Sequence, residues 1–246
     1  MDIGLNILIL HDFITHKYAL ENIFSKHKPN LIALQETDIV QKNKQFLHLL
    51  DYKVCHHNKY YDYAMSGIAI MVQNNINVVQ QIKSVDELLF QTITVKGNKN
   101  LNITNIYKES NVALTTTMVN SINNFNNEHH LVVGDLNSQN TLWGSQKTSI
   151  NGIVWEEFAN ELGLIVLNDG SADGSMASVD LTPCLNWMTL SSSETADHFP
   201  IIISNGGTIY RKRFQPKFLE NRANWSAFST KISCFMEEFN QFENIS

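Results

Sequence analysis

Cysteine is scarce in this sequence, and long apolar stretches are missing. The three cysteines, Cys55, Cys184 and Cys234, are far apart and without a metal-ligand spacing, so we expect buried or unreactive thiols rather than a disulfide framework or a zinc site. No window approaches the roughly 20 apolar residues that a membrane-spanning helix needs. The first residues also lack a basic segment followed by an apolar stretch and a cleavage site. These absences predict an intracellular protein without a membrane partner.

Positive charge is also in deficit. The formal net charge is -6, whereas DNA-binding proteins usually present a basic face to the phosphates. The basic residues gather near the end of the chain, where Arg211, Lys212 and Arg213 begin a stretch that continues to Arg222. This stretch is a candidate for contact with a nucleic-acid backbone, and the alternative is a solvated tail.

Apolar runs alternate with amphipathic segments along the chain. With 246 residues, 43% of them hydrophobic, the chain can bury a sizeable core, and we expect one globular domain over residues 1–204 and a basic and helical tail over residues 205–246. The patterns predict strands at residues 5–10, 31–34, 67–72, 89–95, 101–107, 131–133, 164–167 and 201–203. They predict helices at residues 19–27, 115–125, 152–162 and 225–239. Such interleaving indicates an α/β or α+β sandwich with sheets inside and helices outside.

Polar side chains follow two of the predicted strands. Glu36 comes after the strand at residues 31–34, where its carboxylate could ligate a hard cation such as Mg²⁺; the alternative is an ordinary surface residue. Asp135 and Asn137 follow the strand at residues 131–133 on alternate positions, hence on one face. There the Asp could take a proton from an attacking water while the Asn holds the water or a phosphate oxygen. The alternative for this segment is a turn.

A third polar pair precedes the last predicted strand. Asp197 and His198 lie just before the apolar residues 201–203. An imidazole can donate to a phosphate oxygen, especially when a carboxylate orients its ring, and Asp180 is the candidate for that partner. A lone histidine is usually structural, but several such groups at strand ends together indicate a catalytic site.

Taken together, these segments resemble the endonuclease/exonuclease/phosphatase superfamily, which includes DNase-I-like nucleases and apurinic-site endonucleases. The resemblance covers nearly the whole chain in the right order. Its motifs are Gln-Glu-Thr at residues 35–37, Ser-Gly-Ile-Ala-Ile at 66–70, Asn-Ile-Tyr at 105–107, Gly-Asp-Leu-Asn at 134–137, Val-Asp-Leu-Thr at 179–182 and Asp-His-Phe-Pro at 197–200. Residues 140–145, 151–152, 167–170 and 213–225 further resemble endonucleases of jockey-like non-LTR retrotransposons, which are joined to a reverse transcriptase.

The resemblance implies a four-layer α/β (α+β) sandwich in which two packed mixed β-sheets are flanked by helices. It also implies a Mg²⁺-dependent endonuclease, with Mn²⁺ as an alternative metal, that nicks DNA in the nucleus and leaves a 3′-hydroxyl for a reverse transcriptase to extend. Glu36 would hold the metal with Asp197 close by.

The resemblance further implies a role for each polar side chain in one-step phosphodiester hydrolysis. Asp135 would activate the water and Asn137 would align it. His198, held by Asp180, would stabilise the charged transition state with help from Tyr107.

The sequence departs from the family pattern in two places. The first strand of family members ends with an Asn that helps to hold the metal shell, but here His11 and Asp12 fall nearest, and Asp12 is the candidate for supplying an oxygen ligand. The loop at residues 170–177 is also shorter than the DNA-groove hairpin of the family. These departures leave two alternatives open: a phosphatase of the same superfamily, and a catalytically dead DNA- or protein-binding remnant.

Overall fold

The structure is a computed structural model that describes residues 5–11, 23–40, 47, 49, 51–58, 66–85, 88–97, 99–122, 129–168, 175–190 and 199–205. Several predicted site residues lie outside the described residues, namely Asp12, Asp197, His198, Arg211, Lys212 and Arg213. The predicted tail lies outside them from residue 206 onward. Within the described ranges, no helix has the length and hydropathy needed to cross a membrane.

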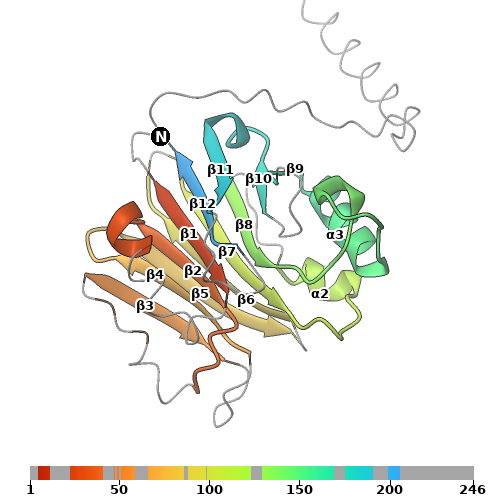
Figure 1. Ribbon diagram of the computed structural model, residues 1–246, viewed down its shortest axis with the longest axis horizontal. Helices are drawn as coiled ribbons and strands as arrows, with labels where there is room; N and C mark the ends of the chain where they lie inside the picture. The colour runs from red at the N-terminus through yellow and green to blue at the C-terminus, as the bar shows by residue number, and fades with distance from the viewer. Residues whose placement is uncertain are drawn as a thin grey trace, which may run out of the picture. The chain divides into compact units, whose positions relative to one another are not determined.

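Two six-stranded sheets form the centre of the described domain (Figure 1). The first sheet has the order β11-β12-β1-β2-β4-β3, with bounds Leu185–Thr189, Ile201–Asn205, Asn6–His11, Leu31–Gln35, Ile68–Gln73 and Tyr52–His57. The second has the order β5-β6-β7-β8-β10-β9, with bounds Val78–Val85, Leu88–Val95, Leu101–Lys108, His129–Asp135, Met176–Ser178 and Leu164–Val166.

Both sheets are mixed, and among the described strands each contains one parallel pair. In the first sheet β1 runs parallel to β2, with His11 opposite Gln35. In the second sheet β7 runs parallel to β8, with Tyr107 opposite Asp135. The other pairings are antiparallel. Ligands of open α/β sheets bind at the carboxyl ends of parallel strands, so the ends of these two pairs are the place to look for a site.

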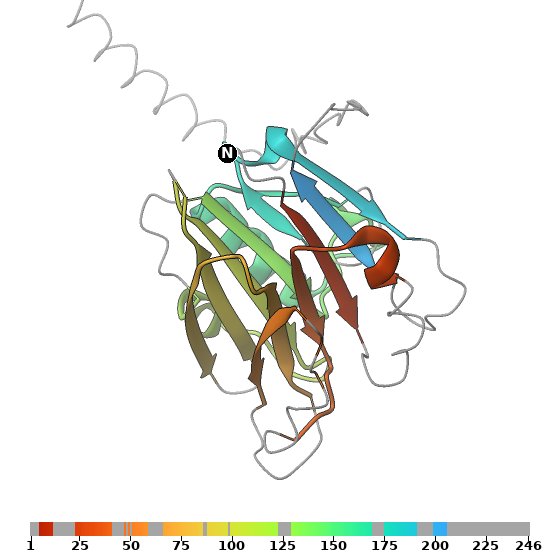
Figure 2. The same cartoon turned by 90° about the vertical axis from the view of Figure 1, so that its left-hand side faces the viewer.

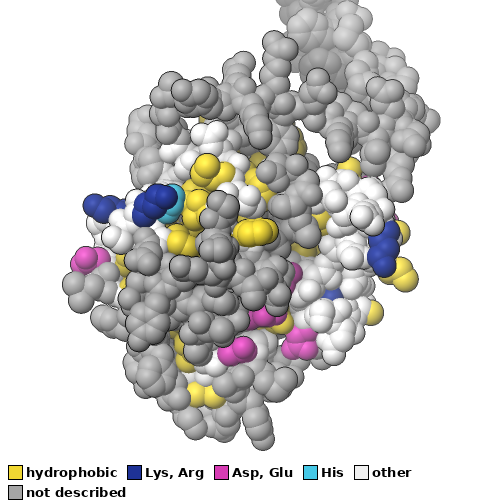
Figure 3. All heavy atoms as spheres, in the orientation of Figure 1, with side chains coloured by type: hydrophobic (Ala, Val, Ile, Leu, Met, Phe, Trp, Pro, Cys, Tyr) yellow, Lys and Arg dark blue, Asp and Glu magenta, His cyan; other side chains and the backbone are white. Residues whose placement is uncertain are grey.

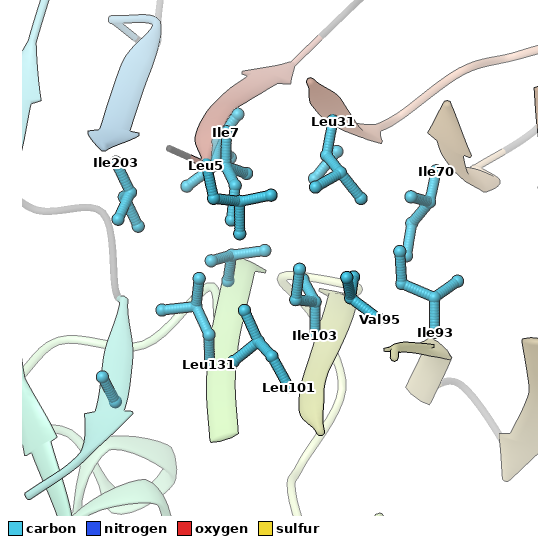
Figure 4. Close-up of a cluster of buried hydrophobic side chains, with 14 of the residues drawn as sticks. Leu5, Ile7, Leu31, Ile70, Ile93, Val95, Leu101, Ile103, Leu131 and Ile203 are labelled. Atoms are coloured by element: carbon cyan, nitrogen blue, oxygen red, sulfur yellow. The ribbon is translucent and has the colours of Figure 1, made fainter. Parts of the chain in front are cut away.

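The inner faces of the two sheets pack on each other through branched aliphatic side chains. Ile7 and Leu31 of the first sheet point toward Ile103 and Leu131 of the second (Figure 4). These side chains are almost wholly buried, and burial of an aliphatic side chain of this size stabilises a fold by about 1.5–3 kcal/mol. The apolar runs of the central strands are thus explained by sheets that are covered on both faces.

Helices cover the outer faces of both sheets (Figures 1 and 2). A helical turn at residues 23–27 packs Ile23 and Phe24 against the outer face of the first sheet. The helices α2 (Thr116–Asn120) and α3 (Ile150–Glu161) lie against the outer face of the second, where Trp155 is fully buried. Two short 3₁₀ helices, η2 (Thr141–Trp143) and η3 (Thr182–Cys184), complete the elements. The predicted fold, two packed mixed sheets flanked by helices, is confirmed.

The described cysteines differ in part from the expectation. Cys55 and Cys184 are free thiols, but Cys184 is exposed and Cys55 is only half-buried. Cys184 ends η3, which has no buried side chain. Of the two expected alternatives, a buried or an unreactive thiol, burial does not apply to Cys184.

Candidate active site

Glu36 follows β2 directly, and its backbone has an unusual conformation. Its φ is +49°, in the left-handed region that few non-glycine residues adopt. The neighbouring Thr37 holds this conformation, because its N–H donates to the Gly67 carbonyl at 3.2 Å and its Oγ1 lies 3.1 Å from His56 Nε2. Strain of this kind costs about 1–3 kcal/mol and clusters at functional sites. The segment that carries Glu36 is therefore fixed from two neighbouring strands.

Tyr107 lies close to two carboxylates. It stands opposite Asp135 in the register of β7 and β8, its side chain is buried, and its hydroxyl donates a hydrogen bond to the Glu36 carboxylate of the other sheet. Burial, this hydrogen bond and the negative charges of Glu36 and Asp135 raise the pKa of Tyr107 far above its ordinary value of 10.0. The phenol therefore stays protonated and neutral at physiological pH.

Replacing Tyr107 with phenylalanine should make stability less sensitive to alkaline pH. From about pH 10 upward the unfolded chain releases this proton while the folded chain keeps it, so stability is lost as pH rises toward the folded pKa. The loss is at most about 1.4 kcal/mol per pH unit. The free energy of unfolding in urea, measured between about pH 9 and 11 without metal, should fall more steeply for the native chain than for Tyr107→Phe. Equal slopes would contradict the raised pKa.

Asn137 is tied to Asp135 rather than pointing into solvent. Its backbone N–H donates to Asp135 Oδ1 at 2.8 Å, and its Nδ2 donates to Asp135 Oδ2 at 2.7 Å and to the Lys108 carbonyl at 2.8 Å. The Asp135 carboxylate and the Lys108 carbonyl are both hydrogen-bond acceptors, so the amide nitrogen of Asn137, and not its oxygen, must face them. Because both amide hydrogens are used, Asn137 can offer only its Oδ1 to a water. Its main effect in this structure is to orient the Asp135 carboxylate.

Lys108 is a residue of this region that sequence reasoning missed. It ends β7, is fully buried, and its Nζ donates to the Glu109 carbonyl at 2.6 Å. Burial lowers the pKa of Lys108, and the negative charges of Asp135 and Glu109 act in the opposite direction. A lysine at the end of a strand that is otherwise without charged residues was the only sequence signal. Because Lys108 is buried beside Asp135, it is the cation nearest to the carboxylates of Asp135 and Glu36 among the described residues of β7 and β8.

The structure places Asp180 away from these residues. Asp180 follows β10, which runs antiparallel to β8 and leads back to the first residue of β8, His129. Its Oδ2 lies 2.8 Å from His129 Nδ1 and 3.7 Å from Lys99 Nζ. His129 and Asp135 are the two ends of β8, about 20 Å apart at about 3.3 Å per residue. The expectation that Asp180 converges with Asp135 is therefore wrong, and Asp180 instead pairs with His129.

The loop after β8 is attached to α3 by buried polar side chains. The Trp143 ring is fully buried, and its Nε1 donates to the Ser138 carbonyl at 3.0 Å. The Asn140 amide donates to the Gly152 carbonyl at 3.0 Å and to Glu156 Oε2 at 2.8 Å. These contacts explain the Trp and Asn of residues 140–145 as supports of the segment that carries Asp135 and Asn137.

The oxygen atoms present are of the kind that a hard divalent cation prefers. Glu36 and Asp135 supply carboxylates, and the buried Oε1 of Gln35 accepts no hydrogen bond from the described residues. Within the described ranges, no three His, Cys, Asp or Glu side chains lie close enough together to hold a metal ion. The other predicted oxygen ligands, Asp12 and Asp197, lie outside these ranges. The donor set therefore fits magnesium in kind, and its completion depends on residues outside the described part.

A comparison with family models matches residues 101–202 to a family described as endonuclease-reverse transcriptase. This range begins with β7 and ends in β12, so it includes Tyr107, Asp135 and Asn137. No curated protein sequence matches the chain.

Solved structures with the same fold include several nucleases. The endonuclease domain of TRAS1, a telomere-specific non-LTR retrotransposon, has a TM-score of 0.69 at 16% identity, covering 82% of this chain and 98% of that domain. The AP endonuclease LMAP of Leishmania major has a TM-score of 0.67 at 12% identity, covering 83% and 88%. The 3′ phosphatase NExo from Neisseria has a TM-score of 0.60 at 13% identity, covering 82% and 100%. Together with the family match over residues 101–202, these likenesses show that the chain has the fold of the endonuclease/exonuclease/phosphatase superfamily.

Proposed function

We propose that this chain is a divalent-metal-dependent phosphodiesterase that nicks DNA. One observation carries the proposal: Glu36 of the first sheet and Asp135 of the second approach one buried phenol, Tyr107, at the carboxyl ends of the two parallel strand pairs. Carboxylates that gather around a buried hydroxyl and strongly shift its pKa are typical of functional sites. DNA is the substrate class because the TRAS1 endonuclease and the AP endonuclease share the fold.

The metal proposed for the site is Mg²⁺, with Mn²⁺ as the alternative. Glu36 would hold it, with Asp197 and Asp12 as further oxygen ligands from outside the described residues. A bound divalent cation would polarise the phosphoryl oxygen and reduce the charge repulsion with DNA. Figure 3 shows acidic side chains gathered on one exposed face, and the chain as a whole carries a net charge of -6. A cation is therefore needed more here than in a basic nuclease.

Each described residue has a defined task in the proposed hydrolysis. Asp135, oriented by two hydrogen bonds from Asn137, takes a proton from the attacking water. The Oδ1 of Asn137 can accept a hydrogen bond from that water. Tyr107 keeps its proton and holds Glu36 in place. His198 remains the proposed donor to the transition-state oxygens, without Asp180 as its orienting partner.

Nicking of supercoiled plasmid tests the proposal directly. With Mg²⁺ the native chain should convert supercoiled DNA to the open circle, and EDTA should stop the reaction because the metal is required. A parallel assay measures phosphate release from a soluble phosphate ester. Phosphate release without nicking would assign the chain to the phosphatase alternative. The fold shared with the 3′ phosphatase NExo is the observation that favours this alternative. Nicking that persists in EDTA would contradict the metal requirement.

The finer proposal is that the chain is the endonuclease domain of a jockey-like non-LTR retrotransposon. The family match, the likeness to the TRAS1 domain and the supporting contacts of Trp143 and Asn140 favour it. The biological partner would be a reverse transcriptase in the same polypeptide, acting in the nucleus. If so, the nick carries a 3′-hydroxyl, and a DNA polymerase will extend it without prior end repair.

A non-enzymatic role is the second candidate because of the residue at the end of β1. His11, which is buried, stands opposite Gln35 where the superfamily resemblance leads us to expect an amide ligand. A binding remnant would retain salt-sensitive DNA binding without nicking, and Asp135→Ala would leave that binding unchanged.

A further inference from the structure

Two fully buried amide side chains meet between the sheets. The Nε2 of Gln35, the last residue of β2, donates to Oδ1 of Asn105 on β7. The Nδ2 of Asn105 donates in turn to the carbonyls of Leu34 at 3.0 Å and Ala69 at 3.1 Å, on β2 and β4. Both side chains are 0% exposed. One side chain of the second sheet thus holds two strands of the first.

The position of this contact relates it to the site. Gln35 directly precedes Glu36, and Asn105 lies two residues before Tyr107 on the same face of β7. The Gln35–Asn105 and Glu36–Tyr107 hydrogen bonds are therefore successive links between the same two strands. Apolar contacts between the sheets are non-directional, whereas hydrogen bonds fix distance and angle.

We propose that Asn105 is a positioning residue that holds Glu36 against Tyr107. Removal of its amide leaves the sheets packed by their aliphatic side chains, but β2 can then shift relative to β7 and Glu36 shifts with it. The catalytic consequence rests on the proposed function, because misplacement of a metal-holding carboxylate by about 1 Å can cost about 100-fold in rate. The structural consequence, loss of the contact between Glu36 and Tyr107, does not depend on any activity.

The chain contains a matched control in Gln91. It stands opposite Asn105 in the register of β6 and β7, is also 0% exposed, and its Nε2 donates at 3.1 Å to the Cys55 carbonyl on β3 of the first sheet. Gln91 therefore makes the same kind of link between the sheets, but to β3, which is linked to Glu36 less directly, through the contact of His56 with Thr37. Its replacement should lower stability and move Glu36 less than replacement of Asn105 does.

A double-mutant cycle between Glu36→Gln and Tyr107→Phe tests the structural part. Urea unfolding of the four proteins of the cycle gives the coupling free energy between the two side chains. The cycle is repeated in Asn105→Leu and in Gln91→Met backgrounds. The coupling should be present in the native chain, retained in Gln91→Met and lost in Asn105→Leu. If Asn105→Leu does not fold, Gln35→Met breaks the same link and should also abolish the coupling. Coupling that survives in the folded Asn105→Leu or Gln35→Met background would overturn the inference.

The plasmid assay then tests the catalytic part. Nicking by Asn105→Leu should be about 10-fold to 100-fold slower than nicking by the native chain and need more Mg²⁺ for half-maximal rate, while Gln91→Met stays within about 2-fold. Equal rates for Asn105→Leu and Gln91→Met would overturn the catalytic part. If the native chain itself does not nick, the proposed function fails, and the coupling measurement still decides whether Asn105 positions Glu36.

Discussion

Asp135→Ala is expected to lower the rate of metal-dependent nicking by about 100-fold to 10,000-fold, the range found when a general base is removed. Asp135 ends β8, is only 5% exposed, and its two oxygens are oriented by hydrogen bonds from Asn137. Alanine keeps the strand but removes the group that is proposed to accept the proton of the water. The measurement is the initial rate of conversion of supercoiled plasmid to the open circle in Mg²⁺.

The control for this prediction is Glu161→Ala. Glu161 ends α3 and is exposed, so its replacement changes the net charge equally without touching the site. Its nicking rate should match that of the native chain, and both variants should show native circular dichroism. Full activity of Asp135→Ala would remove Asp135 from the mechanism.

Gly134→Ala is expected to destabilise the fold by about 3 kcal/mol or more, or to prevent folding altogether. The φ of Gly134 is +129°, which L side chains rarely adopt, and an added Cβ would come within 2.0 Å of the Ile106 carbonyl oxygen. Because that atom belongs to the backbone of the neighbouring parallel strand, it cannot move aside without breaking the pairing of β7 and β8. The urea midpoint, or the yield of soluble protein, measures the effect.

Gly163→Ala separates the two causes of this destabilisation, which are the positive φ of the glycine and the close contact of an added Cβ with a neighbouring strand. Gly163 follows α3 with a φ of +62°, but a Cβ there would meet no atom within 4 Å. Its replacement should cost only about 1 kcal/mol, the typical penalty for a residue with a Cβ in a left-handed helix cap. Similar losses for both variants would show that backbone conformation alone, and not the close approach of β7, requires Gly134.

The central strands could be predicted from the sequence because they are buried on both faces and therefore consist of apolar runs. Three of the four edge strands in the described sheets were missed, together with the short inner strand β10, whereas the edge strand β9 was predicted at residues 164–167. β3, β5 and β11 are edge strands, and β3 contains a lysine and two histidines because one side of it is exposed. A half-exposed strand has no continuous apolar run, so its composition does not distinguish it from a loop. The helix predicted at residues 152–162 corresponds to α3, which begins two residues earlier.

The site shows the same division between local and long-range information. The Gly-Asp-Leu-Asn motif placed Asp135 and Asn137 correctly beside each other, since their contact lies within one loop. The partnership of Gln35 and Asn105 spans 70 residues and depends on how the two sheets face each other, which no local pattern encodes. Asp180 was misplaced for the same reason: its motif was recognised, but the course of β10 leads it to His129.

The distribution of Glu36 and Tyr107 over two sheets has a consequence for how the protein acquires its chemistry during folding. The pairing of β1 with β2 joins segments about 25 residues apart, while the bond from Gln35 to Asn105 closes a loop of 70 residues. Closing the longer loop costs more entropy and belongs to a later step. A chain in which neighbouring strands such as β1 and β2 have paired but the sheets have not docked would have part of the native secondary structure and no assembled candidate site, so recovery of the proposed activity should lag behind the first recovery of circular dichroism in a refolding experiment.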